Sequence, residues 1–232
     1  GYITHAGTGG DMSAAEIGVR GGWGGNRTTK EFLNVLIDTI ANPKADCDLK
    51  FTNIKDKRVY LQQLDSWDIL NVGTFKEGIG VRKFVNVNAD GSAAANYHND
   101  FASIDYPIFR LADAYLMRAE ALLRSGGSRS DALADVNFVR ARAFAGTGVS
   151  GDITDAQLTL DFILDERGRE LYWEGLRRTD LIRFDKFTSA SYTWQWKGLT
   201  LEGKGTEAHR ALYPIPASEV AANPNIKQNV GY

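Results

Sequence analysis

The sequence has little of several residue types on which common classes of function depend. Cysteine occurs once, as Cys47, so the chain can form neither an internal disulfide nor a cysteine metal cluster. The three histidines, His5, His98 and His209, are too far apart in the sequence for the short ligand spacing of a metal site. No stretch approaches the roughly 20 apolar residues that a transmembrane helix needs. The sequence therefore predicts no metal site, no cofactor and no membrane-spanning helix.

Charge excludes a further class of partner. The 27 basic and 29 acidic residues give a net charge of -2, and no basic run is interleaved with aromatics, so we expect no nucleic-acid binding.

No Gly-x-Ser-x-Gly elbow and no phosphate-binding loop is present. The aspartates at 46, 48, 65 and 68 lack the central glycine and closing glutamate of a calcium loop.

The first hundred residues are rich in turn-forming residues. Glycine clusters occupy 7–10 and 21–25, which favours irregular loops. Apolar residues at helical spacing predict one helix over 29–41, and alternation over 81–87 before Asp90-Gly91 predicts a strand and a turn. We therefore interpret residues 1–100 as a loop-rich ligand-binding region with one helix and short strands.

Residues 101–232 have helical periodicity instead. Gly126-Gly127 ends the first expected helix, Ser128 or Ser130 caps the next, and Thr154 with Gln157 fits a capping box. The residues 192–196 alternate like a strand, with a turn at 203–205. The expected helices span 106–125, a segment around 134–141, 154–175 and 178–187. The predicted fold class is mostly α, with an irregular loop-rich part and short β-hairpins.

The pair of helices over 106–143 resembles a tetratricopeptide unit. Such units place a leucine, a small residue and an aromatic on one helix and alanine, phenylalanine and alanine on the other. The matching residues are Leu111, Ala112 and Tyr115, then Ala134, Phe138 and Ala141. One unit cannot bury its own face, so we expect stacked neighbours upstream. A plain helical hairpin is the alternative.

Charged residues repeat along the third expected helix. Arg167, Glu170, Glu174 and Arg177 share one face if the helix continues past Gly175. A neighbouring arginine keeps each carboxylate ionised, which is unsuited to acid catalysis at neutral pH. We interpret these residues as structural ion pairs, and we predict no catalytic residue and no enzyme activity.

Aromatic residues outside the helices are the candidate ligand contacts. Trp23 lies between paired glycines beside Asn26 and Arg27, and a flat ring on a loop can stack on a sugar while polar neighbours bind its hydroxyls. Tyr2 and Trp67 have similar settings, whereas we expect Trp194 and Trp196 to pack under a hairpin. The alternative is that Trp23 fills the core beneath its loop. The predicted ligand-binding residues are Tyr2, Trp23, Asn26, Arg27 and Trp67.

An ordered series of motifs resembles the SusD/RagB family of nutrient-binding outer-membrane lipoproteins of Bacteroidetes. The series comprises Phe109 to Glu120, Val136 to Arg140, Arg167 to Leu171, Glu174 to Arg177, Asp180 to Arg183, Pro214 to Pro216 and Gln228 to Tyr232. No single motif is specific, but the order and the closing Gln-Asn-x-Gly-Tyr are typical of the family. The resemblance covers most of 101–232 and is weaker over 20–60.

The resemblance implies a non-enzymatic protein at the surface of the outer membrane. Such a protein is attached to the membrane only through a lipid anchor. It binds glycans or peptides and delivers them to a TonB-dependent transporter of the SusC kind. The lipobox cysteine and most of the scaffold are absent, so we expect this chain to associate with an upstream N-terminal half of the same protein. The family has no fixed binding motif, so no binding residue is carried over.

Two other functions remain open. A tetratricopeptide-type interaction scaffold predicts more repeats upstream and no sugar affinity, and a peptide ligand would replace glycan within the same family. A glycoside hydrolase needs two carboxylates across a cleft, and the sequence offers no such pair.

Overall fold

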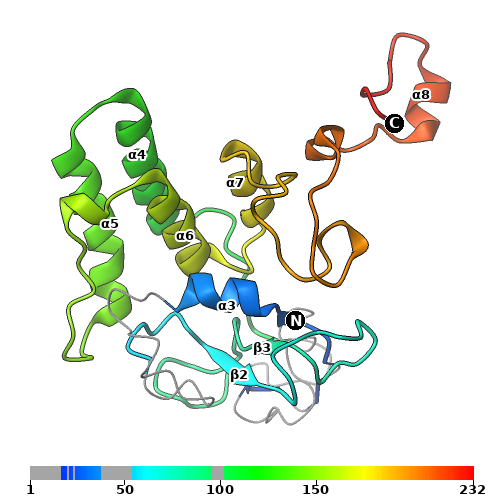
Figure 1. Cartoon of the computed structure of the whole chain (residues 1–232). Helices are drawn as coiled ribbons and strands as arrows, with labels where there is room; N and C mark the ends of the chain where they lie inside the picture. The colour runs from blue at the N-terminus through cyan, green and yellow to red at the C-terminus, as the bar shows by residue number, and fades with distance from the viewer. Residues whose placement is uncertain (1–16, 20, 23, 38–53, 96–101) are drawn as a thin grey trace. The chain divides into compact units, whose positions relative to one another are not determined.

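The computed structural model of the chain describes residues 17–19, 21–22, 24–37, 54–95 and 102–232 (Figure 1). Contacts divide the chain into two compact units, Gly1–Arg177 and Arg178–Tyr232. The described part is mostly helical with one small three-stranded sheet, which confirms the predicted fold class. The division by sequence character at residue 100 stays a prediction. No helix in the described ranges has the length and hydrophobicity to cross a membrane.

Three helices form the main core of the first unit. Helix α4 (Leu111–Ser125) packs against both α5 (Arg129–Phe144) and α6 (Leu160–Leu171). The left-handed Gly126 ends α4, and the Ser128 side chain accepts a hydrogen bond from Asp131 N–H to begin α5, as the sequence predicts. Buried residues from all three helices meet in the core, among them Leu116, Ala119, Ala132, Val136, Val139 and Ile163.

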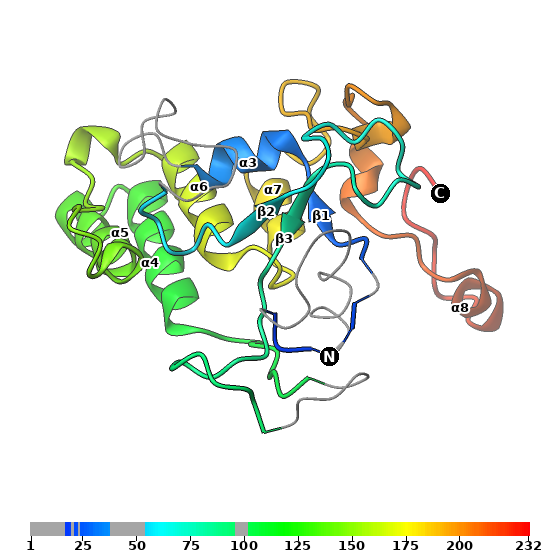
Figure 2. The same cartoon turned by 90° about the horizontal axis from the view of Figure 1, so that it is seen from below.

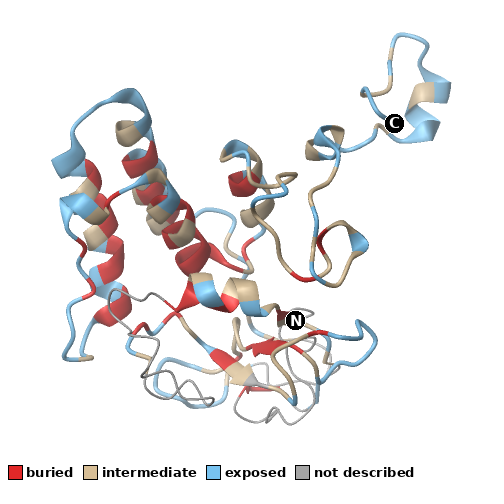
Figure 3. Ribbon diagram, viewed as in Figure 1, coloured by how far each residue is buried: buried red, intermediate tan, exposed pale blue. Residues whose placement is uncertain are grey.

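The buried faces of α4 and α5 differ from the expected tetratricopeptide positions. Phe138 and Leu111 are 57% and 67% exposed, whereas Leu116 and Val136 are fully buried. The Tyr115 and Phe138 rings contact each other on the outer face, with centroids 4.6 Å apart. Figure 3 shows the buried residues of both helices on their inner sides. The helix pair thus leaves exposed the aromatic face that a stacked neighbour would cover.

The second core of this unit joins a short helix to the sheet. Strand β3 (Ile79–Val81) lies between β1 (Arg27–Thr28) and β2 (Leu61–Gln63), antiparallel to both (Figure 2). Helix α3 (Lys30–Leu36) packs on the sheet through Leu33 and Leu36 and contacts α6 as well. These contacts place the loops of the sheet beside the end of α6.

Several predicted boundaries in the first hundred residues are wrong. Helix α3 ends at Leu36 because Ile37 is extended, and residues 38–41 lie outside the described residues. Strand β3 shares only Val81 with the predicted strand 81–87, and the Lys83 side chain, just beyond it, binds Glu174. The predicted turn at Asp90-Gly91 is confirmed, because Val87 pairs with Ala93 across it.

After residue 100, the observed helix boundaries also differ from the predicted ones. Helix α4 begins at Leu111 rather than Tyr106, because Pro107 favours an extended residue before it and Arg110 is itself extended. The capping-box segment forms a separate 3-10 turn, η2 (Asp155–Gln157), since Leu158 and Thr159 are extended between it and α6. Tyr172 is also extended, so α6 does not reach Gly175.

The second unit consists of short elements and turns. Helix α7 (Arg177–Arg183) leads into it and ends before the left-handed Asp185, earlier than the predicted Phe187. Two 3-10 turns, η3 (Lys197–Leu199) and η4 (Ala208–Ala211), and helix α8 (Ala217–Ala222) follow. The predicted strand over 192–196 is wrong, because left-handed Trp196 turns the backbone into η3.

Candidate functional site

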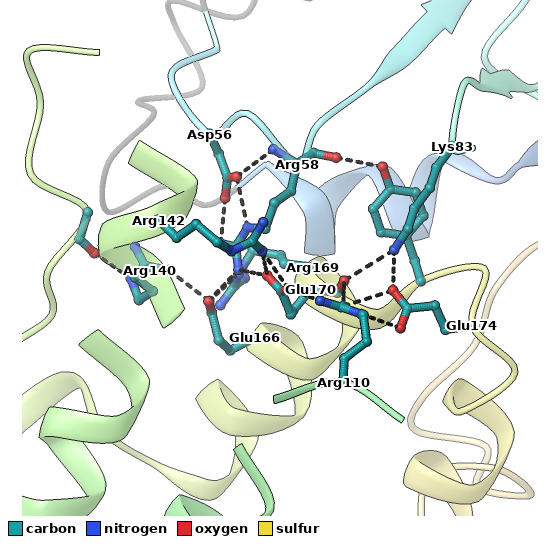
Figure 4. Close-up of polar contacts among 12 residues, drawn as sticks. Asp56, Arg58, Lys83, Arg110, Arg140, Arg142, Glu166, Arg169, Glu170 and Glu174 are labelled. Carbon is teal, nitrogen blue, oxygen red and sulfur yellow. Dashed lines mark hydrogen bonds and ion pairs between the residues drawn. The ribbon is translucent and has the colours of Figure 1, made fainter. Parts of the chain in front are cut away.

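A buried cluster of ion pairs occupies the end of α6 in the first unit (Figure 4). Glu166 lies at its centre and is fully buried. Three arginines bind it: Arg58 at 2.6 Å, Arg140 at 2.8 Å and Arg169 at 2.8 Å. Because these arginines come from the segment before β2, from α5 and from α6, the cluster fastens three parts of the chain together.

Arg58 is fixed from two sides. Asp56 holds its guanidinium through two bonds, Nε to Oδ1 at 2.9 Å and Nη2 to Oδ2 at 2.6 Å. Its remaining nitrogen, Nη1, reaches Glu166 and also Glu170 at 3.3 Å. Because a guanidinium is planar and carboxylates bind it on two sides, the Arg58 side chain is held in one orientation.

Glu170 and Glu174 form the outer half of the cluster. Arg110 binds Glu170 at 2.8 Å and Glu174 at 2.8 Å, and so ties the extended segment before α4 to the end of α6. Arg142 of α5 binds Glu170 at 2.6 Å, and Lys83 binds Glu174 at 2.5 Å. Both carboxylates are buried, whereas the Arg142 side chain is 62% exposed.

Glu170 and Glu174 do form ion pairs, but the predicted helix ladder with Arg167 and Arg177 is wrong. Because α6 ends at Leu171, Glu174 lies beyond the helix and the four residues do not share one helical face. Arg167 instead binds Asp113 of α4 at 2.8 Å, and Arg177 donates to the Leu164 carbonyl at 2.7 Å. The partners of Glu170 and Glu174 are distant in sequence, which is why spacing did not identify them.

The charges of the cluster keep its central carboxylate ionised. Burial alone would raise the pKa of Glu166, but Arg58, Arg169 and Arg140 outweigh burial and hold that pKa far below its ordinary value of 4.5. Burial lowers the pKa of Lys83, although Glu174 acts in the opposite direction. A carboxylate of this kind does not exchange protons near neutral pH, so the arrangement suits holding a structure in place rather than proton transfer.

A pocket of about 420 Å³ opens beside the outer half of the cluster. We call it the Lys83 pocket. Three rings contribute to its walls, those of Tyr60, Phe84 and Tyr172. The Tyr172 hydroxyl donates to the Arg58 carbonyl at 2.5 Å, which fixes that ring beneath the Lys83 ammonium. The charged residues that line the pocket are Lys57, Arg58, Arg82, Lys83, Arg110, Arg142, Glu170 and Glu174.

A second pocket, of about 360 Å³, lies within the second unit. Half-buried Trp194 and Trp196 line it, and the hairpin expected to cover them is absent because residues 192–205 form no strand. The Arg178 guanidinium lies between the rings of Phe187 and Tyr213, at 4.8 and 4.0 Å from their centroids. The buried Lys197 ammonium donates to the carbonyls of Lys186 at 3.2 Å, Ser189 at 2.6 Å and Tyr192, which stabilises the surrounding turns.

The predicted ligand residues fall in different settings. Tyr2 and Trp23 lie outside the described residues. Trp67 is half-buried against the core of α3 and the sheet, and Asn26 is half-buried just before β1. Their role in binding a ligand stays a prediction.

Arg27 organises the loop that joins β2 to β3, residues 64–78. Its guanidinium donates to the Thr74 and Val72 carbonyls at 2.6 Å each and lies 5.4 Å from the centre of the Phe75 ring. Phe75 is 54% exposed. This ring was not among the predicted contacts, because its neighbours in sequence are not the glycine-rich residues that drew attention to Trp23.

Comparison with known proteins identifies the family to which this mostly helical chain belongs. Residues 47–232 match the model of the SusD family, and the chain belongs to that family. The chain is 40% identical, over 161 residues, to the starch-binding protein SusD of Bacteroides thetaiotaomicron; these are 69% of this chain and 27% of that protein. The SusD-like protein P38 of Formosa agariphila is 32% identical over 166 residues, covering 69% of this chain and 29% of that protein.

A solved structure extends the similarity to nearly the whole chain. A crystal structure of a Bacteroides vulgatus protein to which sugar binding is ascribed matches with a TM-score of 0.56 at 26% identity, and covers 96% of this chain and 43% of that one. In the two curated relatives, by contrast, the match to this chain spans less than a third of their length.

Proposed function

We propose that the protein binds a glycan at the cell surface, without catalysing a reaction on it. Family membership supports this proposal, and one relative is named as a starch-binding protein. Within the chain, the observation that carries it is the 64–78 loop, where Arg27 fixes the backbone at Val72 and Thr74 and the Phe75 ring faces solvent. A fixed exposed ring can stack on the apolar face of a sugar without a large loss of conformational entropy.

Most of the predicted ligand residues lie close to this loop or to its Arg27 anchor along the chain. Asn26 and Arg27 precede β1, Trp67 lies in the loop that Arg27 holds, and Trp23 is a few residues upstream of Asn26. We infer that these residues and Phe75 form the glycan contact. Tyr2 belongs to the same proposal as a second stacking ring.

Affinity electrophoresis against soluble starch and other neutral glycans, followed by calorimetry, tests the assignment. Phe75→Ala, Trp23→Ala and Trp67→Ala are expected to weaken binding about fivefold or more, since loss of one stacking ring costs on the order of 1 kcal/mol or more. Val230→Ala is the control, because Val230 is 92% exposed and lies outside the loop. Unchanged retardation of Phe75→Ala and Trp23→Ala would sink the assignment, and binding of peptides alone would favour the peptide alternative.

We further propose that the protein delivers its ligand to a SusC-like TonB-dependent transporter and is held on the outer membrane by a lipid anchor outside this chain. Family membership supports both statements. Co-purification of the full-length protein with such a transporter from outer membranes tests the partnership. Absence of the transporter from the purified material, with glycan binding intact, would overturn it.

A second proposal concerns protein contacts. Exposed apolar side chains on α4, on α5 and on the segment before them include Phe109, Leu111, Met117 and Phe138. We infer that the upstream half of the same protein covers these side chains, as stacking of helix pairs requires. Co-expression of that half with Phe138→Ser should reduce association, and a stable, monomeric 1–232 that does not bind the half would contradict the inference.

A further inference from the structure

The Lys83 pocket has more positive than negative side chains in its lining. Glu170 and Glu174 are its only carboxylates among the described residues, and both are held by the buried cluster. Glu170 binds Arg58, Arg110 and Arg142, while Glu174 binds Arg110 and Lys83. The negative charge at the base of the pocket is therefore already matched by neighbouring cations.

Further positive charge lies in the outer lining. Lys57 is exposed, and Arg82 is half-buried with its guanidinium 4.7 Å from the centre of the Tyr60 ring. These cations converge on a concave surface that has low-dielectric walls, so their fields add in the pocket. The lowered pKa of Lys83, caused first by burial and opposed by Glu174, fits a site where positive charge is costly. A bound anion would relieve that cost.

The remaining lining suits a small ring-shaped ligand. Tyr60, Phe84 and Tyr172 supply aromatic surface, and Arg82 and Lys83 supply hydrogen-bond donors directly beside it. The volume of about 420 Å³ lies in the range of small-molecule sites. Aromatic surface with a few convergent polar groups is the composition of sugar sites.

We propose that the Lys83 pocket binds a negatively charged sugar residue, with its carboxylate or sulfate ester held by Lys57 and Arg82. This site is separate from the 64–78 loop. The anion part of the proposal stands on the pocket alone, whereas the sugar part rests on the proposed glycan function. A net charge of -2 for the whole chain favours a neutral ligand, so this pocket adds a local preference that the composition does not predict.

Calorimetry on the full-length protein with four probes tests the proposal: glucuronate, glucose 6-sulfate, glucose and inorganic sulfate. Glucuronate and glucose 6-sulfate are expected to bind, more weakly as sodium chloride is raised, and glucose is expected to bind at least tenfold more weakly. Lys57→Gln and Arg82→Gln should each weaken the charged sugars about fivefold, the size of one partly exposed ion pair. Lys227→Gln removes the same charge from an exposed position in the second unit and should leave binding unchanged.

Each outcome decides one part. Binding of only one of the two charged sugars supports the site and identifies its substituent as carboxylate or sulfate. Equal affinity for glucose and glucuronate overturns the anion site, and equal affinity for sulfate and glucose 6-sulfate overturns the sugar assignment. An equal loss in Lys227→Gln overturns the location. Because Phe75→Ala acts on the loop and not on this pocket, it should leave glucuronate binding intact, so failure of the loop proposal is recognised separately.

Discussion

Arg140 of α5 and Glu166 of α6 meet at 2.8 Å, and neither side chain is exposed to solvent. Arg140 also donates through Nε to the Gly151 carbonyl, so one guanidinium joins two helices and the loop between them. Its charge lies among the rings of Phe144 and Phe162, each 5.4 Å from the guanidinium carbon. Buried in this way, Arg140 depends on Glu166 for neutralisation.

Removal of the central charge should be strongly destabilising. Glu166→Gln leaves Arg58, Arg140 and Arg169 without their shared carboxylate, and breaking a buried ion pair typically costs about 3–5 kcal/mol. The free energy of unfolding in urea measures the loss. Glu207→Gln breaks an exposed pair with Arg210 and should leave stability unchanged. Equal stability of Glu166→Gln and the natural protein would show that the cluster does not hold this unit together.

Lowering the pH should reduce the free energy of unfolding, because Glu166 becomes protonated. Because the pKa of Glu166 is depressed in the folded state, its contribution is fully present above the unfolded value near 4.5 and is lost as pH falls toward the folded pKa. One such group gives a slope approaching about 1.4 kcal/mol per pH unit between roughly pH 4 and pH 3. Urea unfolding of the natural protein and Glu166→Gln over this range should show a shallower decline for the variant. Parallel slopes would argue that other carboxylates account for acid unfolding.

Gly151 is expected to tolerate no side chain. A Cβ at this position would lie 2.1 Å from the Phe144 Cδ2 atom, and Phe144 is buried. Gly151→Ala should therefore cost about 1–3 kcal/mol through overpacking and through displacement of the carbonyl that Arg140 binds. Gly21→Ala is the control, because its Cβ would have no heavy atom within 4 Å. Thermal unfolding compares the two, and equal melting temperatures would contradict the packing argument.

The second unit should depend on Lys197. Lys197→Met removes the ammonium from the carbonyls of Lys186, Ser189 and Tyr192, and a buried acceptor left without its donor costs about 1–3 kcal/mol. Hydrogen exchange should become faster over residues 186–197 and stay unchanged in α4 and α5. Lys227→Met, at an exposed position, should alter neither region. Unchanged exchange over 186–197 in Lys197→Met would show that the turns hold without the ammonium.

Local signals in the sequence predicted much of the helical fold. Gly126 and Ser128 marked the turn between α4 and α5 correctly, because each acts on backbone groups within a few residues. Boundaries that depend on distant contacts were wrong. Lys83 binds Glu174 just beyond the sheet, and Arg110 holds an extended segment where the periodicity predicted helix.

The candidate sites were less accessible to sequence reasoning. Glu170 and Glu174 were singled out but the central Glu166 was not, and Arg58 and Arg110 lie 112 and 60 positions from Glu170, beyond any helical spacing. Phe75 was missed because its exposure depends on how Arg27 fixes the loop. One signal was available: Asp56 and Arg58 lie two residues apart within residues 20–60, where the resemblance to the family is weaker.

The long reach of Arg58 also bears on the lifetime of the folded state. Its bonds to Glu166 and Glu170 cross 108 and 112 positions of the chain, so they close only after the entropy of a large loop has been overcome. Contacts that form after the rate-limiting step of folding act mainly by slowing unfolding. We therefore expect the Arg58 bonds to form late and to prolong the folded state of the first unit, so that Arg58→Ala raises the unfolding rate more than it lowers the folding rate.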